Sequence, residues 1–232
     1  MRNLAIVAGS AALVGVLGAE AALAQPSRII LLRHGEKKNS AELCDVGALR
    51  AQALSDQYLG KGASGNEIIF GKGGKPDAFF TVTLHTQETA EPSAKSWGKQ
   101  VTAFLVPPKD PNEDSDLDTQ TLSAAAELNS AEYDGKTVVV VWEHKHIAKK
   151  NLNNTFRTLL RLGDIVNADV PKSWEGVNYD FLWIIDYAKS PPKFTVVQQE
   201  YAGAAGAKIP DNPWGKDVDP NKFPEFYQDC KH

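Results

Sequence analysis

The sequence is poor in cysteine and carries no excess of basic residues. Two cysteines among 232 residues exclude a disulfide scaffold and a zinc-ribbon cysteine pattern. Lysine and arginine number 25 against 29 acidic residues, which gives a formal net charge of −4 at pH 7. Because broad nucleic-acid binding draws most of its affinity from a basic surface, we expect no nucleic-acid partner.

Long apolar runs are missing after residue 24, but one occupies the N-terminus. Met1-Arg2-Asn3 precedes a nearly uncharged stretch that ends in Ala22-Leu23-Ala24. A basic start, an apolar stretch and a small-x-small site are typical of a secretory signal peptide. The alternative is a membrane anchor, because the run approaches the roughly 20 residues that span a bilayer. We expect residues 1–24 to be a signal peptide, and the cleaved protein to be periplasmic or secreted without membrane contact.

The mature chain, residues 25–232, contains no internal repeat and no linker, so we expect one domain. Its glycine-rich stretch, 61–75, lacks the Gly-x-x-x-x-Gly-Lys-Ser/Thr pattern of a Walker-type phosphate loop. Export to an oxidising compartment would allow a disulfide between Cys44 and Cys230. Two unpaired thiols are an equal alternative from the sequence alone.

Apolar runs alternate with segments of helical periodicity along the mature chain. The expected strands cover residues 28–32, 77–84, 137–142, 181–187 and 193–201, and the expected helices cover 45–59, 86–104, 119–133 and 147–162. The last two strands flank Ser190-Pro191-Pro192, which favours an antiparallel pair at a sheet edge. We therefore predict an α/β three-layer sandwich: a mostly parallel central sheet, flanked by helices, with an antiparallel edge strand.

Histidine is also scarce, and four of the five histidines fall at predicted strand ends. His34 follows the first strand, His85 the second, and His144 and His146 the valine-rich strand 137–142. In open α/β sheets, ligands bind where strands end and helices begin. We expect these four side chains to meet at one edge of the sheet.

Arg33-His34-Gly35 suits attack on a phosphoryl group. A histidine ring nitrogen can act as the nucleophile if the charge on the phosphate oxygens is balanced. Arginine donates two parallel hydrogen bonds to a phosphate, and glycine lets the backbone approach closely.

Several motifs are similar to those of the histidine phosphatase superfamily, which includes cofactor-dependent phosphoglycerate mutases and acid phosphatases. The motifs are Leu31-Leu32-Arg33-His34-Gly35-Glu36-Lys37, the helix start around Asp45-Val46-Gly47 with Gln52-Ala53, Glu88-Thr89-Ala90-Glu91-Pro92, and the valine strand before His144. The chain resembles a divergent, exported member of this group. The resemblance covers residues 29–148, and the final third of the chain carries no matching signature.

The resemblance implies a phosphohydrolase that forms a phosphohistidine on His34, with Arg33 and His144 binding the phosphate. The expected substrate is a small anionic phosphomonoester, without a cofactor. His85 stands where the superfamily has a second arginine, and a protonated His85 would still donate one bond, which favours acidic pH. The alternative is a non-catalytic relative that only binds anions. His146 is a second phosphate-binding candidate, because residues i and i+2 of an extended strand point the same way.

Two further expectations concern the general acid and metal. The acidic loop 107–118 offers Glu113 as general acid; the alternative interpretation is a solvated acidic loop without a catalytic role. We expect no metal ligands; the competing hypothesis is a zinc hydrolase in which His144-x-His146 joins His34 or His85, with Glu143 nearby. Oligomeric state is not indicated by the sequence.

Overall fold

The computed structural model describes residues 24–206, 208–217 and 229–231. The predicted signal peptide therefore lies almost wholly outside the described residues, as does the fifth histidine, His232. Among the residues that are described, no helix has the length and apolar character needed to cross a membrane.

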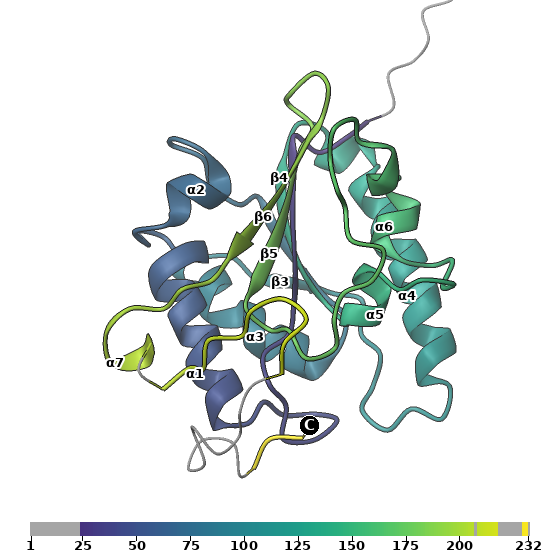
Figure 1. Ribbon diagram of the computed structural model, residues 1–232. Helices are drawn as coiled ribbons and strands as arrows, with labels where there is room; N and C mark the ends of the chain where they lie inside the picture. Colours follow the sequence, from purple (N-terminus) through teal and green to yellow (C-terminus); the bar gives the residue numbers. More distant parts are fainter. Residues whose placement is uncertain (1–23, 207, 218–228, 232) are drawn as a thin grey trace, which may run out of the picture.

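A six-stranded sheet with the strand order β3-β2-β4-β1-β5-β6 forms the centre of the fold (Figure 1). The strands are β1 (Arg28–Arg33), β2 (Ala78–Thr81), β3 (Val101–Ala103), β4 (Thr137–Trp142), β5 (Phe181–Asp186) and β6 (Lys193–Gln198). The pairs β1–β4, β4–β2 and β2–β3 are parallel, whereas β5 is antiparallel to both β1 and β6. The predicted fold class is confirmed, including the antiparallel pair at the sheet edge.

Alternate residues of the central strands enter two separate cores. Ile29 and Leu31 pack on one face with α4 (Glu113–Leu128), α5 (His144–Ile147) and α6 (Phe156–Leu159). Ile30 and Leu32 pack on the other with α1 (Asp45–Leu54), α2 (Asn66–Phe70) and α3 (Leu84–Ser96). Both faces are apolar because helices cover both, which is why β1 and β4 are continuous apolar runs in the sequence. Figure 1 shows α1 and α2 on one side of the sheet and α4, α5 and α6 on the other.

The helices are shorter and more numerous than the sequence pattern predicted. They are α1 (Asp45–Leu54), α2 (Asn66–Phe70), α3 (Leu84–Ser96), α4 (Glu113–Leu128), α5 (His144–Ile147), α6 (Phe156–Leu159) and α7 (Gly203–Gly206), with a π-helical turn at Ser55–Leu59 and 3₁₀ turns at Ala131–Tyr133 and Leu162–Asp164. The expected loop 61–75 contains α2, and the expected acidic loop 107–118 contains the first turns of α4.

The prediction of one helix over 86–104 is wrong, because Gly98 ends α3. Gly98 adopts a φ of +66°, and its N–H and that of Lys99 donate to the carbonyls of Lys95 and Ala94. This is the glycine-centred helix end in which a left-handed residue satisfies the last carbonyls. The released chain forms the missed strand β3 beside β2.

The prediction of one helix over 147–162 is also wrong. Ala148 is extended, with a φ of −156°, and Asn151 has a φ of +70°, so the helix cannot continue past Ile147. Two separate short helices, α5 and α6, take its place.

A disulfide joins Cys44 to Cys230, with 5.2 Å between the two Cα atoms. The N–H of Lys231 also donates to the carbonyl of Lys37 at 2.7 Å. The chain end is thereby tied to the loop that follows His34. Of the two alternatives for the cysteines, the structure contains the disulfide.

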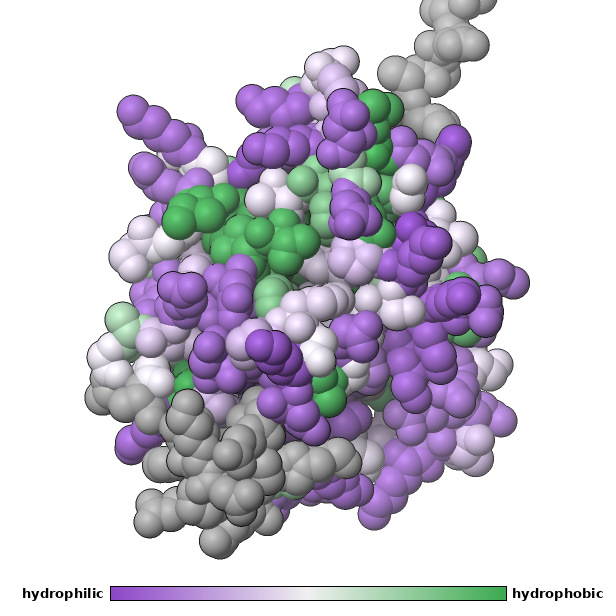
Figure 2. All heavy atoms as spheres, in the orientation of Figure 1, coloured by the Kyte–Doolittle hydropathy of each residue, from purple (hydrophilic) through white to green (hydrophobic). Residues whose placement is uncertain are grey.

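Hydrophobic surface gathers over α2 and the edge strand β6 (Figure 2). The large apolar side chains there are Ile68, which is 65% exposed, and Val196, which is 42% exposed. β6 pairs on one side only, with β5, among the strands of the described chain. This face lies away from the histidine-bearing strand ends.

Candidate active site

The register of the parallel strands brings three segments to one edge of the sheet. Arg33 pairs with Trp142, and Thr81 pairs with Val141, so β1, β4 and β2 end at the same level. His34 and Glu143 follow immediately after β1 and β4. Parallel strands point their carboxyl ends the same way, so this meeting is a consequence of the topology.

His85 reaches the same edge from the first turn of α3. Thr86 Oγ1 accepts from the N–H groups of Val82 and Thr83, which caps the start of the helix. The helix therefore begins at Leu84, and His85 is a helical residue rather than a strand end. Its side chain is buried, and its ring centroid lies 4.4 Å from that of His34.

The imidazole of His34 is fixed in one tautomer. Its Nδ1 lies 2.6 Å from the carbonyl oxygen of Gly35, which can only accept, so Nδ1 carries the hydrogen. The Gly35 N–H donates in turn to Thr89 Oγ1 at 2.9 Å. Nε2 is left with its lone pair free. Burial lowers the pKa of His34 to about 4, so the ring is neutral at ordinary pH.

Glu143 lies between the two imidazoles. Its Oε1 accepts from His85 Nε2 at 2.5 Å, and its Oε2 lies 3.3 Å from His34 Nε2 without hydrogen-bond geometry. Burial alone would raise the pKa of Glu143, but its interactions with His34 and His85 outweigh burial and hold the pKa well below its ordinary value. A carboxylate therefore faces Nε2 of His34.

Arg33 is held from one side and free on the other. Its Nη1 donates to the carbonyls of Gly176, at 2.5 Å, and Asn178, at 3.3 Å, and its Cζ lies 3.7 Å from the ring centre of Tyr179. Nε is buried without a hydrogen-bond partner in the described part of the chain. The guanidinium is thus positioned by the loop 176–179, and its Nε–Nη2 edge is left to bind an anion.

His144 and His146 point in different directions. The prediction that they share a direction assumed an extended strand, but residues 144–147 form one turn of helix, in which i and i+2 lie on nearly opposite sides. Burial lowers the pKa of His144 to about 2, with Arg33 and His34 adding to the effect, so His144 belongs to the cluster. His146 Nε2 instead bonds Asp118 at 3.1 Å and lines a small cavity of about 170 Å³ between α4 and α5.

Glu113 is exposed in the first turn of α4. Within the described chain, no hydrogen bond or ion pair joins it to His34, His85 or His144. Its role as general acid stays a prediction.

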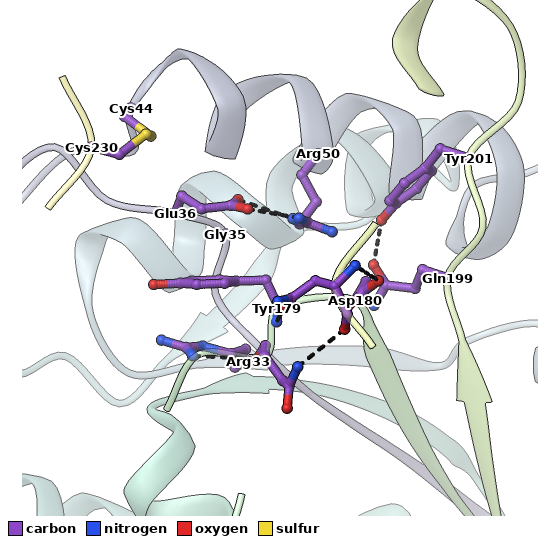
Figure 3. A network of polar contacts seen from close by, with 12 residues as sticks. Arg33, Gly35, Glu36, Cys44, Arg50, Tyr179, Asp180, Gln199, Tyr201 and Cys230 are labelled. Carbon is purple, nitrogen blue, oxygen red and sulfur yellow. Dashed lines mark hydrogen bonds and ion pairs between the residues drawn. A yellow bond between two sulfur atoms is a disulfide. The ribbon is translucent and has the colours of Figure 1, made fainter. Parts of the chain in front are cut away.

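A buried ion pair supports the segment that follows His34 (Figure 3). Arg50 donates from Nε and Nη2 to the two carboxylate oxygens of Glu36, at 2.9 and 2.6 Å, and both side chains are almost fully buried. Gly35 allows α1 this close, because a Cβ there would lie 2.9 Å from the carbonyl oxygen of Gly47. The same network extends through Tyr201, whose hydroxyl bonds Gln199, to Asp180, whose pKa burial raises to about 6.

Sequence reasoning gave Glu143 only a secondary role and missed Tyr179 and the Glu36–Arg50 pair. Glu143 stands beside His144 at the end of the clearest strand, so its position carried a signal. Arg50 carried a weaker one, as a basic residue within an otherwise apolar helix. Tyr179 lies in a loop with no recognisable pattern.

The comparisons with known proteins establish no family for this chain. No family model matches, and no curated protein matches. Among solved structures, the chain is similar to a protein assigned as the phosphohistidine phosphatase SixA of Agrobacterium tumefaciens, with 15% identity and a TM-score of 0.42 over 75% of this chain and 97% of that one. It is also similar to a mycobacterial glucosyl-3-phosphoglycerate phosphatase, with 13% identity and a TM-score of 0.38 over 76% of this chain and all of that one. These similarities are too distant to assign a function to this chain.

Replacing Arg50 with Met should lower the free energy of unfolding by about 3–5 kcal/mol, because Glu36 would keep a buried charge without a partner. Urea denaturation at pH 7 measures the loss. The matched control is Lys95→Met, which breaks the exposed Glu91–Lys95 pair and should cost under about 1 kcal/mol. Adding Glu36→Gln to Arg50→Met should recover part of the loss. Equal, small losses for Arg50→Met and Lys95→Met would contradict the stabilising role of the buried pair.

Proposed function

We propose that this protein hydrolyses phosphomonoesters through a phosphohistidine formed on Nε2 of His34. The observation that carries the proposal is the fixed tautomer of His34: Nδ1–H is bonded to the Gly35 carbonyl, so Nε2 offers its lone pair. The ring is neutral because its pKa is about 4. A neutral imidazole with one committed nitrogen is a prepared nucleophile.

Arg33 and His144 would bind the phosphoryl oxygens. The unpaired Nε–Nη2 edge of Arg33 presents two parallel N–H groups, which suit a phosphate. His144 is neutral, since its pKa is about 2, and donates one hydrogen bond from its ring N–H. The loop 176–179 lies over Arg33 and against His144, so we infer that it moves aside when substrate enters.

The proton would be handled by Glu143 and His85. A phosphate bound beside Glu143 raises the pKa of this carboxyl, so the Glu143–His85 pair takes up one proton as the substrate binds. Nε2 attacks phosphorus, the ester P–O bond breaks, and the leaving oxygen takes this proton from Glu143. Water then attacks phosphorus, the N–P bond breaks, and the water proton returns to the pair. The Glu143 carboxylate rotates away from Nε2 as the phosphoryl group arrives, because both occupy the same side of His34.

The second candidate function is anion binding without turnover. It is favoured by His85, which stands where the superfamily that the sequence resembles has a permanently charged arginine. Arg33 and His144 would still bind an anion, but the charge that develops in the transition state would be stabilised less. In either case we propose a small phosphorylated anion as the ligand.

We also propose that the chain is exported to the periplasm or secreted. The proposal is supported by the N-terminal pattern of residues 1–24 and by the Cys44–Cys230 disulfide, because disulfides persist in oxidising compartments.

The mature protein should hydrolyse p-nitrophenyl phosphate between pH 4 and 8, and EDTA should not abolish turnover. His34→Ala should reduce kcat by about 10³-fold or more, because it removes the nucleophile. Turnover should fall below about pH 4, where His34 gains a proton and loses its lone pair. Vanadate binding without turnover at any pH would instead support the anion-binding function.

Two isosteric variants identify the general acid. Glu143→Gln keeps the size of the side chain but cannot release a proton, so kcat should fall by about 10²–10⁴-fold. KM should fall as well, because a negative charge leaves the phosphate site. The matched control, Glu113→Gln, should stay close to wild type, since Glu113 is exposed on α4. The opposite ranking of the two variants would transfer the role to Glu113.

Export can be tested by producing the full chain in a bacterial host with a periplasm. The recovered protein should begin near Gln25, and its cysteines should resist alkylation until they are reduced. Leu13→Arg, which places a charge in the apolar stretch, should block processing. A processed Leu13→Arg protein, or a wild-type protein that keeps residues 1–24, would speak against the proposal.

A further inference from the structure

We propose that the same cluster is a binding site for a divalent transition-metal cation, with His34, His85 and Glu143 as ligands and Zn²⁺ as the best-suited ion. The three side chains are buried, and one potential ligand atom from each lies within 4.8 Å of the other two. Two imidazoles and a carboxylate form a donor set that zinc uses in hydrolytic sites.

The orientation of His34 favours a metal as strongly as it favours a nucleophile. A metal-binding histidine usually donates its second ring N–H to a carbonyl or carboxylate, which fixes the ring and aims the other nitrogen at the ion. His34 does this through Nδ1 and the Gly35 carbonyl, at 2.6 Å. Gly35 is itself held by Thr89, at 2.9 Å, so an outer layer of support is already present.

Glu143 and His34 present two acceptors to each other. Nε2 of His34 has a free lone pair, and Oε2 of Glu143 lies 3.3 Å away without a hydrogen-bond geometry. Two ligand atoms about 2.0–2.2 Å from a tetrahedral zinc are roughly 3.3 Å apart. A cation between them would convert the repulsion of two lone pairs into coordination.

His85 has to change tautomer to become the third ligand. In the structure its Nε2–H is committed to Glu143 Oε1 at 2.5 Å, which is shorter than the separation of two zinc ligands, and its Nδ1 is buried without a partner in the described chain. When the hydrogen resides on Nδ1 instead, Nε2 offers a lone pair and the ring moves back from the carboxylate. Metal uptake is therefore coupled to breaking the His85–Glu143 hydrogen bond.

The surrounding charges permit a cation. Glu143 is the negative charge nearest to both imidazoles, and the Glu36–Arg50 pair is balanced within itself. Arg33 opposes a cation, but its guanidinium is drawn to the carbonyls of Gly176 and Asn178 and to the face of Tyr179.

Metal and phosphomonoester should exclude each other, because both require Nε2 of His34. This competition rests on the proposed function. Zinc would then inhibit hydrolysis, and a chelator would raise the turnover of metal-loaded protein. A zinc hydrolase would show the reverse, since a chelator would abolish its activity.

The test is calorimetric titration of Zn²⁺ into the chelator-treated mature protein with its disulfide intact. Wild type should bind one equivalent with micromolar or tighter affinity. Glu143→Gln and His85→Gln should each weaken binding by well over 10-fold, since even outer-layer partners of a metal ligand contribute about that much. His146→Gln is the matched control: it removes a histidine that bonds Asp118 instead, and binding should be unchanged.

Cobalt substitution and thermal melting distinguish the loss of a metal ligand from the loss of folding. Co²⁺ should give intense visible bands typical of four-coordination in wild type and His146→Gln, but not in Glu143→Gln, and the melts show whether each variant is folded. No stoichiometric binding to wild type, or loss of binding in His146→Gln but not in folded His85→Gln, would overturn the assignment. Binding without phosphatase turnover would support the metal site while contradicting the proposed function, and turnover without binding would do the opposite.

Discussion

The Glu36–Arg50 ion pair is the constraint on which the arrangement of this sheet edge depends. The segment after His34 has no regular structure of its own, yet it must hold an imidazole in one orientation. Two hydrogen bonds from Arg50 fix Glu36 against α1. Gly35 packs so closely against Gly47 that a side chain at residue 35 would not fit. Because both side chains are buried, removing either charge would leave the other buried without a partner. The position of His34 therefore follows from packing between a loop and a helix as much as from β1 itself.

One carboxylate determines the chemical character of the site. Without Glu143, the strand ends would present three imidazoles and an arginine, a set that favours anions. With it, His85 is engaged in a short hydrogen bond and Nε2 of His34 faces a negative charge. The site is therefore close to electrical balance, and small changes, such as a proton gained or a side chain rotated, alter which kind of ion it prefers. The proposed phosphate and metal chemistries would be two outcomes of the same geometry.

The fold could be predicted where a single local signal dominates. The four valines of β4 fit few environments other than a buried strand, and the apolar run of β1 is equally clear, so the edge at which the site forms was predictable. The helices were less predictable, because backbone conformations such as those of Gly98 and Asn151 end them earlier than the apolar pattern suggests. The directions of His144 and His146 depended on whether residues 144–147 are extended or helical, which four residues cannot reveal. Tyr179 is brought to Arg33 by a loop from the last third of the chain, a contact that depends on the whole topology.

The disulfide changes the connectivity of the molecule as well as its rigidity. Cys44 and Cys230 are 186 residues apart, so the bond closes nearly the entire domain into one covalent ring, from the start of α1 to the last described residues. A single cut of the backbone anywhere within that ring leaves both pieces linked, and the sheet can remain assembled around the break. Such a macrocycle tolerates a backbone cut that would separate an open chain into two fragments.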